Sequence, residues 1–234
     1  MVPKYTIAAF REVDTPITQP ITKFGGQPVW IAEPQWPISR ATGQPMRFIC
    51  QIALDEWAFG SLAGRMAYVF LTENEEKSLF VDNTYDPDGG ENAVVIQPGG
   101  GVEGQWNAQA TGPTLSKLVW DDPPAPNQPV RFVPIELAVE LSAEQDPDVL
   151  DEDLARDEGA AAYDAYWDHV GDNKIGGTPA FLQFPEYPLG QDARLLLQLN
   201  EPQDMALSLN FAGAGVAYAF ISVDGLRGKL LWQC

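Results

Sequence analysis

The hexapeptide KFGGQP at residues 23–28 returns as KIGGTP at residues 174–179, an offset of 151 residues. Each copy is followed, in the same order, by an apolar stretch, an aromatic–proline pair and three apolar strands. The later blocks keep nearly the same offset. Five blocks that preserve both order and spacing predict two diverged copies of one β unit.

A unit of about 60 residues buries too little surface to be stable alone, so we expect the two units to pack around a pseudo-twofold axis. The Gly–Gly pair suits a tight turn or bulge, because glycine adopts positive φ at little cost. We therefore predict one α+β domain, rich in β-strand, over residues 1–234. Copy one spans residues 23–83, copy two spans residues 174–234, and residues 84–173 insert a loop and an acidic helix.

The matching strands RFICQI and RLLLQL, which begin at Arg47 and Arg194, carry the candidate cleft of the domain. Successive side chains of a strand point to opposite faces, so we expect Phe48, Cys50 and Ile52 to share the core face. The arginine and glutamine of each strand lie on the other face. That polar face is predicted to meet solvent or a cleft shared by the two copies.

An aromatic turn precedes each of these strands. Trp30 and Trp36 flank the turn in copy one, where copy two has Phe181 and Tyr187. Such positions suit an aromatic cleft for a peptide or a small ligand. The candidate cleft residues are Lys23, Lys174, Arg47, Arg194, Gln51, Gln198, Trp30 and Trp36.

The insert is predicted to contain two strands and one helix. Residues 93–96 and 130–141 are typical of strands, and the Gly- and Pro-rich stretch 98–129 is typical of a long loop. Asp146 and the proline after it predict the start of an amphipathic helix within residues 147–170. The residues expected to face the body are Leu150, Leu154 and Tyr166. The outer face gives a candidate acidic partner surface of Asp151, Glu152, Asp153 and Asp157, with a merely solvated face as the alternative.

Several marks together resemble the YwqG-like family, a group of mainly bacterial proteins without an established activity. They are the Lys-x-Gly-Gly-x-Pro start, the Trp36-Pro37 step, CQIAL at 50–54, LFVD at 79–82, LLQ at 196–198 and the Gly-rich lead from 213 to 220. These marks cover most of the chain outside residues 1–22 and the acidic middle. The resemblance implies a β-rich fold with an internal duplication, and it brings no agreed catalytic residues.

The composition restricts the partners and the compartment. The formal charge is −19, with 14 Lys and Arg against 33 Asp and Glu, which argues against binding to nucleic acid or to anionic membranes. The charge favours basic partners, or it serves only solubility. Two cysteines are too few for a secreted disulfide framework, and neither a signal peptide nor a membrane span is recognisable. We expect a cytoplasmic protein.

No stretch of the sequence has the complete pattern of a known cofactor-binding, metal-binding or nucleophile motif. GGGVEG at 99–104 follows a strand but opens no long helix, so it predicts a glycine loop and not a dinucleotide site. The acidic turn of Asp82, Asp86, Asp88 and Glu91 does not fit an EF-hand frame, which leaves a polar turn or a loose calcium site. His169, the one histidine, is expected at a helix end. We predict no cofactor and no metal.

These observations favour a non-catalytic intracellular binding protein. One concrete form is an acidic inhibitor or immunity protein that neutralises a basic partner such as a toxin. The alternatives are a hydrolase that uses carboxylates, with or without a divalent metal, and a structural subunit. The sequence leaves the oligomeric state open.

Overall fold

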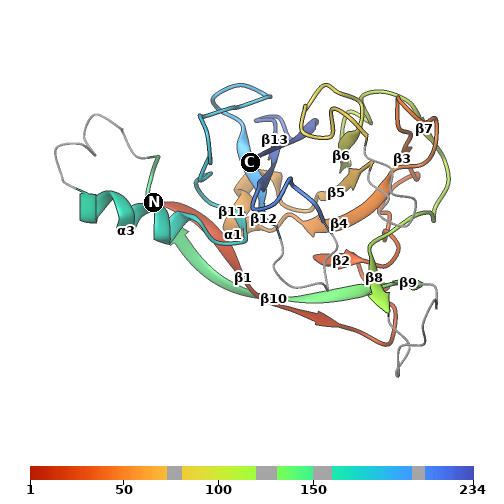
Figure 1. The fold of residues 1–234 in the computed structure, drawn as a ribbon, viewed down its shortest axis with the longest axis horizontal. Helices are drawn as coiled ribbons and strands as arrows, with labels where there is room; N and C mark the ends of the chain where they lie inside the picture. Colours follow the sequence, from red (N-terminus) through yellow and green to blue (C-terminus); the bar gives the residue numbers. More distant parts are fainter. Residues whose placement is uncertain (73–80, 120–130, 150–159, 202–208) are drawn as a thin grey trace.

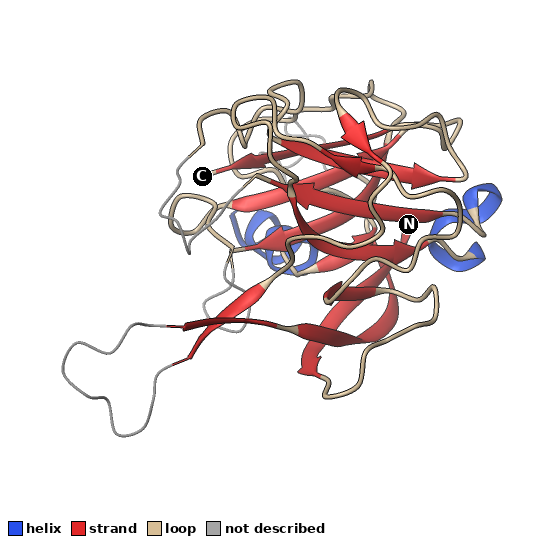
Figure 2. Cartoon of the chain, turned by 90° about the vertical axis from the view of Figure 1, so that its right-hand side faces the viewer, coloured by secondary structure: helices blue, strands red, loops and turns tan. Residues whose placement is uncertain are grey.

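The computed structural model describes residues 1–72, 81–119, 131–149, 160–201 and 209–234. Strands dominate these residues, and ten strands close into one barrel (Figures 1 and 2). Around the barrel they are β1 (Val2–Glu12), β10 (Glu136–Asp146), β2 (Lys23–Gly25), β4 (Arg47–Ala53), β5 (Met66–Leu71), β6 (Asn92–Gln97), β14 (Gly228–Gln233), β13 (Val216–Ile221), β12 (Arg194–Asn200) and β11 (Lys174–Gly176). The predicted β-rich class is therefore confirmed.

The strand order reads alike from both ends of the β1–β10 pair. On one side β10 leads to β2, β4, β5 and β6, and on the other side β1 leads to β11, β12, β13 and β14. We call these two sets the first and second halves of the barrel. Gly25 of β2 lies opposite Glu136 of β10, and Gly176 of β11 lies opposite Lys4 of β1. β10, which pairs with the first half, precedes the second half in the chain, whereas β1, which pairs with the second half, precedes the first half.

The remaining elements are not strands of the barrel. They are β3 (Trp36–Pro37) paired with β7 (Trp106–Asn107), β8 (Ser116–Val119) paired with β9 (Arg131–Pro134), α1 (Glu56–Phe59), η1 (Gly60–Leu62) and α3 (Ala160–Val170). Figure 1 shows α3 beside the N-terminal end of β1. Among the described residues, no helix is long and apolar enough to cross a membrane.

A bulge in β4 corrects the predicted alternation. The register of β4 against β5 shifts between Phe48 and Cys50, which lets Ile49 join Cys50 and Ile52 in one apolar cluster. Phe48 packs in a different cluster with Trp36. The extra residue resets the two-residue period, so Phe48 points away from the face that it was predicted to share. β12 has the same shift between Leu195 and Leu197.

Three apolar clusters support this architecture. The largest takes side chains from all ten barrel strands, such as Ile7, Leu137 and Leu230, and fills the barrel interior. A second packs Trp36, Phe48, Tyr68 and Phe70 on the outside of the first half. The third packs Phe181, Leu195, Tyr218 and Phe220 on the outside of the second half.

The helix predicted within residues 147–170 is confirmed as α3, but the start predicted for it is wrong. Asp146 does not cap a helix, because it ends β10 with its side chain fully buried and residues 147–149, which follow it, are not helical. The strand matched to β14 by sequence, at residues 77–81, lies mostly outside the described residues, and β6 occupies the place corresponding to β14. The strands predicted at 93–96 and 130–141 are confirmed as β6 and as β9 with β10. Leu150, Leu154 and the four candidate acidic residues lie outside the described residues.

Candidate binding site

The two lysines of the repeated hexapeptide are buried braces. Lys23 Nζ donates to the carbonyls of Ile17 and Gln27, at 3.1 and 2.7 Å. The same ammonium lies 2.5 Å from Glu136 Oε1. Through these bonds Lys23 holds together the two loops that flank β2. Since its side chain is only 1% exposed, it is not available to a ligand.

Lys174 does the same for the second half. Its Nζ donates to the carbonyls of Val170 and Thr178, at 2.7 and 2.5 Å. It also lies 2.6 Å from Asp146 Oδ2, and its side chain is fully buried. The carbonyl acceptors therefore stand four residues after the lysine in both halves, at Gln27 and Thr178.

Gln51 and Gln198 are buried in matching roles. Gln51 accepts from the Val29 amide and donates to the Ile21 carbonyl. Gln198 accepts from the Ala180 amide and donates to the carbonyls of Val170 and Asp172. Each glutamine ties its aromatic turn to the loop that precedes its half.

The four other candidate residues also contact the chain itself. Arg194 donates to the carbonyls of Ala58 and Phe59, while Arg47 is buried. Trp36 is buried, and half-buried Trp30 donates to the Ala110 carbonyl. The structure therefore does not open the predicted shared cleft between these residues, because the glutamine side chains of β4 and β12 are buried and bonded to loops of the chain itself. Gln198 does reach the edge of a groove in the second half.

A buried ion cluster that the sequence did not reveal adjoins Lys174. Asp146 Oδ1 lies 2.8 Å from Lys4 Nζ, Asp146 Oδ2 lies 2.6 Å from Lys174 Nζ, and all three side chains are 0% exposed. Burial lowers the pKa of Lys174 to about 8, although Asp146 opposes this shift. Burial acts to raise the pKa of Asp146, but hydrogen bonds from Lys174 and Lys4 hold that pKa below its ordinary value.

A groove of about 620 Å³ opens on the second half. It lies between α3 and the aromatic turn that follows β11. Its lining is mostly apolar or aromatic and includes Tyr166, Trp167, Phe181, Leu182 and Tyr187. The volume falls within the range of about 300 to 1,000 Å³ that is usual for ligand sites.

Exposed acidic residues lie close in the chain to the residues that line this groove. Asp164 and Asp168 stand four residues apart on α3, so they share one face of the helix, and both are exposed. Asp172 and Asp148 are exposed next to the lining residues Gly171 and Val149. No lysine or arginine lines the groove in the described part of the chain. We call Asp148, Asp164, Asp168 and Asp172 the acidic rim.

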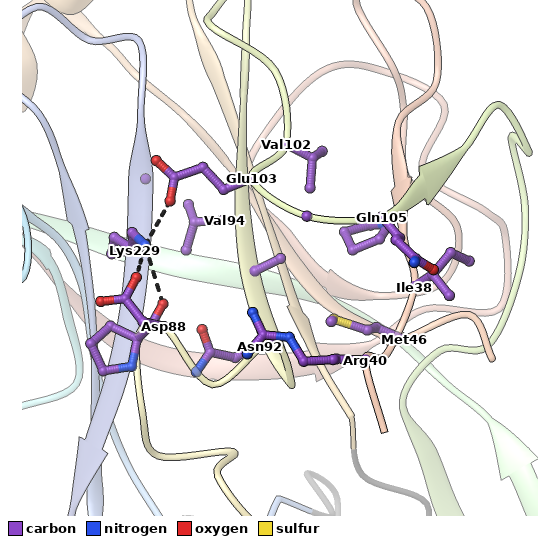
Figure 3. A pocket seen from close by; sticks show the side chains of 16 residues that line it. Ile38, Arg40, Met46, Asp88, Asn92, Val94, Val102, Glu103, Gln105 and Lys229 are labelled. Atoms are coloured by element: carbon purple, nitrogen blue, oxygen red, sulfur yellow. Dashed lines mark hydrogen bonds and ion pairs between the residues drawn. The ribbon is translucent and has the colours of Figure 1, made fainter. Parts of the chain in front are cut away.

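A smaller hollow of about 230 Å³ lies at the seam where β14 meets β6 (Figure 3). Lys229 is paired there with Asp88 and, at 2.6 Å, with Glu103. Burial opposes protonation, but these two carboxylates raise the pKa of Lys229. Exposed Arg40 borders the same hollow, and apolar side chains such as Met46 complete its lining. Since its charges largely satisfy one another, this hollow is a weaker candidate than the groove.

The acidic turn around Asp88 and the glycine loop at residues 99–104 both contribute residues to the lining of this hollow. Glu91 is buried and accepts from the Ser39 hydroxyl at 2.6 Å and from the Ala41 amide at 2.7 Å, so it anchors a turn. The loop GGGVEG contributes Val102 and Glu103 to the seam hollow. Among the described residues, no three or more His, Cys, Asp or Glu side chains lie together in a way that could hold a metal ion. His169 lies in the last turn of α3, as predicted.

The chain is a ten-stranded β-barrel protein whose two halves have the same strand order and matching hydrogen bonds from a lysine, a glutamine and a tyrosine. More specifically, the chain belongs to the family described as a domain of unknown function, DUF1963, whose model matches residues 22–230. No curated protein matches the chain. The groove and the acidic rim are thus the features of the described residues that bear on its function.

Proposed function

We propose that this chain is a non-catalytic binding protein that holds a basic segment of a partner protein in the groove beside α3. The observation that carries the proposal is an aromatic groove of about 620 Å³ that is lined by no cation among the described residues, with the exposed carboxylates of Asp168 and Asp172 next in the chain to its lining residues Trp167 and Gly171. An apolar lining supplies contact area, and the surrounding charge attracts and orients a basic partner. An acidic inhibitor or immunity protein for a basic toxin is one form of this function.

The alternatives find less support. A carboxylate hydrolase at the seam hollow would have to use Asp88 and Glu103, and both are bound to Lys229. A passive structural subunit leaves the open groove unexplained. The formal charge of −19 agrees with a basic partner and with the cytoplasmic location that we propose.

We further infer that the two halves are diverged copies of one unit, as in the YwqG-like proteins that the sequence resembles. The support is a set of matching bonds. Tyr68 donates to the Val29 carbonyl and Tyr218 donates to the Ala180 carbonyl, two residues that are 151 positions apart. Gln97 and Gln233 each accept from an amide of the aromatic turn, at Ala32 and Gln183, which are again 151 positions apart.

The proposal is tested by selecting random dodecapeptides on the immobilised native protein and measuring their affinity by fluorescence anisotropy. We expect the selected peptides to be rich in Lys and Arg and to bind more weakly as salt is raised. The double substitution Asp168→Asn/Asp172→Asn should weaken binding about tenfold. A matched pair that removes the same charge elsewhere, Glu33→Gln/Asp82→Asn, should leave the affinity within about twofold.

A second pair of variants tests the apolar lining. Leu182 lines the groove and is 49% exposed, and its counterpart Ile31 is 39% exposed in the first half. Both amides donate to the buried tyrosine of their half, so both backbones are held alike. Leu182→Ser should weaken peptide binding about fivefold, whereas Ile31→Ser should not. Equal effects of the two substitutions, or peptides without basic residues, would contradict the proposal.

A further inference from the structure

The first half already shows how an extended chain segment lies on such an aromatic turn. Residues 105–113 cross its outer cluster, and β7 pairs with β3 there. The Gln27 side-chain amide donates to the Gly112 carbonyl at 3.0 Å and accepts from the Gly112 amide at 2.9 Å. Trp30 Nε1 donates to the Ala110 carbonyl at 3.0 Å. The segment is thus held mainly through its peptide groups.

The aromatic turn of the second half has the same geometry. Trp30 stacks on Phe70 at 6.2 Å with 15° between the rings, and Phe181 stacks on Phe220 at 6.1 Å with 17°. Tyr187 packs edge-on against Phe181 at 5.2 Å. Phenyl and phenol rings replace the two larger indoles of the first half.

Within the described residues, no extended segment covers this second turn. Phe181 and Tyr187 line the groove instead, and the smaller rings leave more room above them. The position of Gln27 is taken by Thr178, whose hydroxyl already donates to the Pro147 carbonyl at 2.6 Å. Any clasp on an incoming segment must therefore come from other polar side chains of the groove.

Two polar side chains of the groove meet this requirement. The Tyr187 hydroxyl and the Gln191 amide both belong to lining residues, and neither has a hydrogen-bond partner among the described residues. Burial raises the pKa of Tyr187, so the phenol stays protonated and is a donor at neutral pH. Gln191 follows Gly190 in a turn, as Gln44 follows Gly43 in the first half.

We infer that the occupant of the groove is an extended segment of the partner chain, held through its backbone in the manner of residues 105–113. The Tyr187 hydroxyl donates to one backbone carbonyl, and the Gln191 amide bonds a neighbouring peptide group. A Lys or Arg side chain of the segment reaches the acidic rim at Asp168 and Asp172. This inference rests on the proposed function, because it specifies how the basic segment binds.

The test uses the tightest dodecapeptide from the selection and the full-length protein. Tyr187→Phe and Gln191→Ala each remove one hydrogen bond to the peptide and should weaken binding about threefold to tenfold. The controls are Tyr85→Phe, an exposed tyrosine outside the groove, and Gln44→Ala, the counterpart of Gln191 in the first half. Neither control should change the affinity. N-methylation of each peptide amide in turn should identify at least one position that loses more than tenfold.

The outcomes separate this inference from the proposed function. Basic peptides that bind through Asp168 and Asp172 but tolerate Tyr187→Phe, Gln191→Ala and every N-methylation would overturn backbone recognition and leave the proposed function standing. If no basic peptide is selected, both proposals fail. If the two groove substitutions and one N-methylation weaken binding while the controls do not, the backbone mode is supported.

Discussion

The substitution Asp146→Asn separates two readings of one residue. As a helix cap, which the sequence predicts, Asp146 would contribute about 1 kcal/mol. As the structure places it, Asp146 lies with 0% exposure between the ammonium groups of Lys4 and Lys174, which are also 0% exposed. Removing one partner of a buried pair costs about 3 to 5 kcal/mol, because the remaining charge stays buried without compensation.

We therefore expect Asp146→Asn to lower the free energy of unfolding by about 3 to 5 kcal/mol, a large share of the usual total of about 5 to 15 kcal/mol. The measurement is urea denaturation at pH 7, followed by tryptophan fluorescence, with the slope against urea compared between variants. The Thr178 amide, which donates to Asp146 Oδ2 at 2.9 Å, keeps an acceptor in the amide side chain. The loss therefore reports mainly on charge.

Asp148→Asn is the matched control. Asp148 stands two residues later and pairs with the N-terminal ammonium at 3.0 Å, but its side chain is 81% exposed. Such a pair contributes about 0 to 1 kcal/mol. Similar costs for the two substitutions, or a cost near 1 kcal/mol for Asp146→Asn with an unchanged slope, would refute the assignment of a buried ion cluster.

Three further predictions concern the same frame. The pKa of Lys174 is about 8 in the folded chain, whereas its ordinary value is 10.5. Between these two pH values the unfolded chain binds more protons than the folded chain, so the free energy of unfolding should rise with pH by up to about 1.4 kcal/mol per pH unit. Urea titrations of Lys174→Met should lack this rise. Gln51→Ala and Gln198→Ala should each cost about 1 to 3 kcal/mol in urea unfolding, and a cost below 0.5 kcal/mol for either, on the order of a surface change, would contradict the bracing role. A Cβ on Gly25 would stand 2.2 Å from the Ile135 carbonyl oxygen, whereas one on Gly43 meets nothing within 4 Å, so thermal unfolding should show Gly25→Ala as far more damaging than Gly43→Ala.

The local pattern of the sequence predicted the strands and the turn well. The Gly–Gly pairs adopt positive φ at all four positions, 63° and 62° at Gly25 and Gly26 and 74° and 79° at Gly176 and Gly177, because the strand must turn sharply there. The order of strands also follows the repeated blocks throughout the second half, and as far as β5 in the first. These features depend on residues close together in the chain, where alternation and turn chemistry are informative.

The sequence does not predict the burial of the candidate cleft residues, because burial depends on segments that are distant in the chain. Lys23 and Gln51 look like solvent-facing residues of a strand, yet they satisfy carbonyls at Ile17, Ile21 and Gln27 that loops bring over the barrel. Nothing near Asp146 in sequence announces two lysines at positions 4 and 174. The bulge after Phe48 carries no special residue either, so a strict two-residue period was assumed.

What the two halves do not share is the best guide to function. The lysine, glutamine and tyrosine bonds recur in both halves because they satisfy backbone groups that every such turn leaves unpaired, and a ligand cannot use them without breaking the frame. The halves differ above their aromatic turns. Residues 105–113 cover the first turn, whereas among the described residues no such segment lies over the second, where buried Phe181 and half-buried Tyr187 line the groove beside α3. The matching hydrogen bonds of the lysine, glutamine and tyrosine therefore hold the aromatic turn that lines the groove as rigidly as the turn that residues 105–113 cover. Rigid support reduces the ordering that binding must otherwise impose, which favours recognition at the second half over the first.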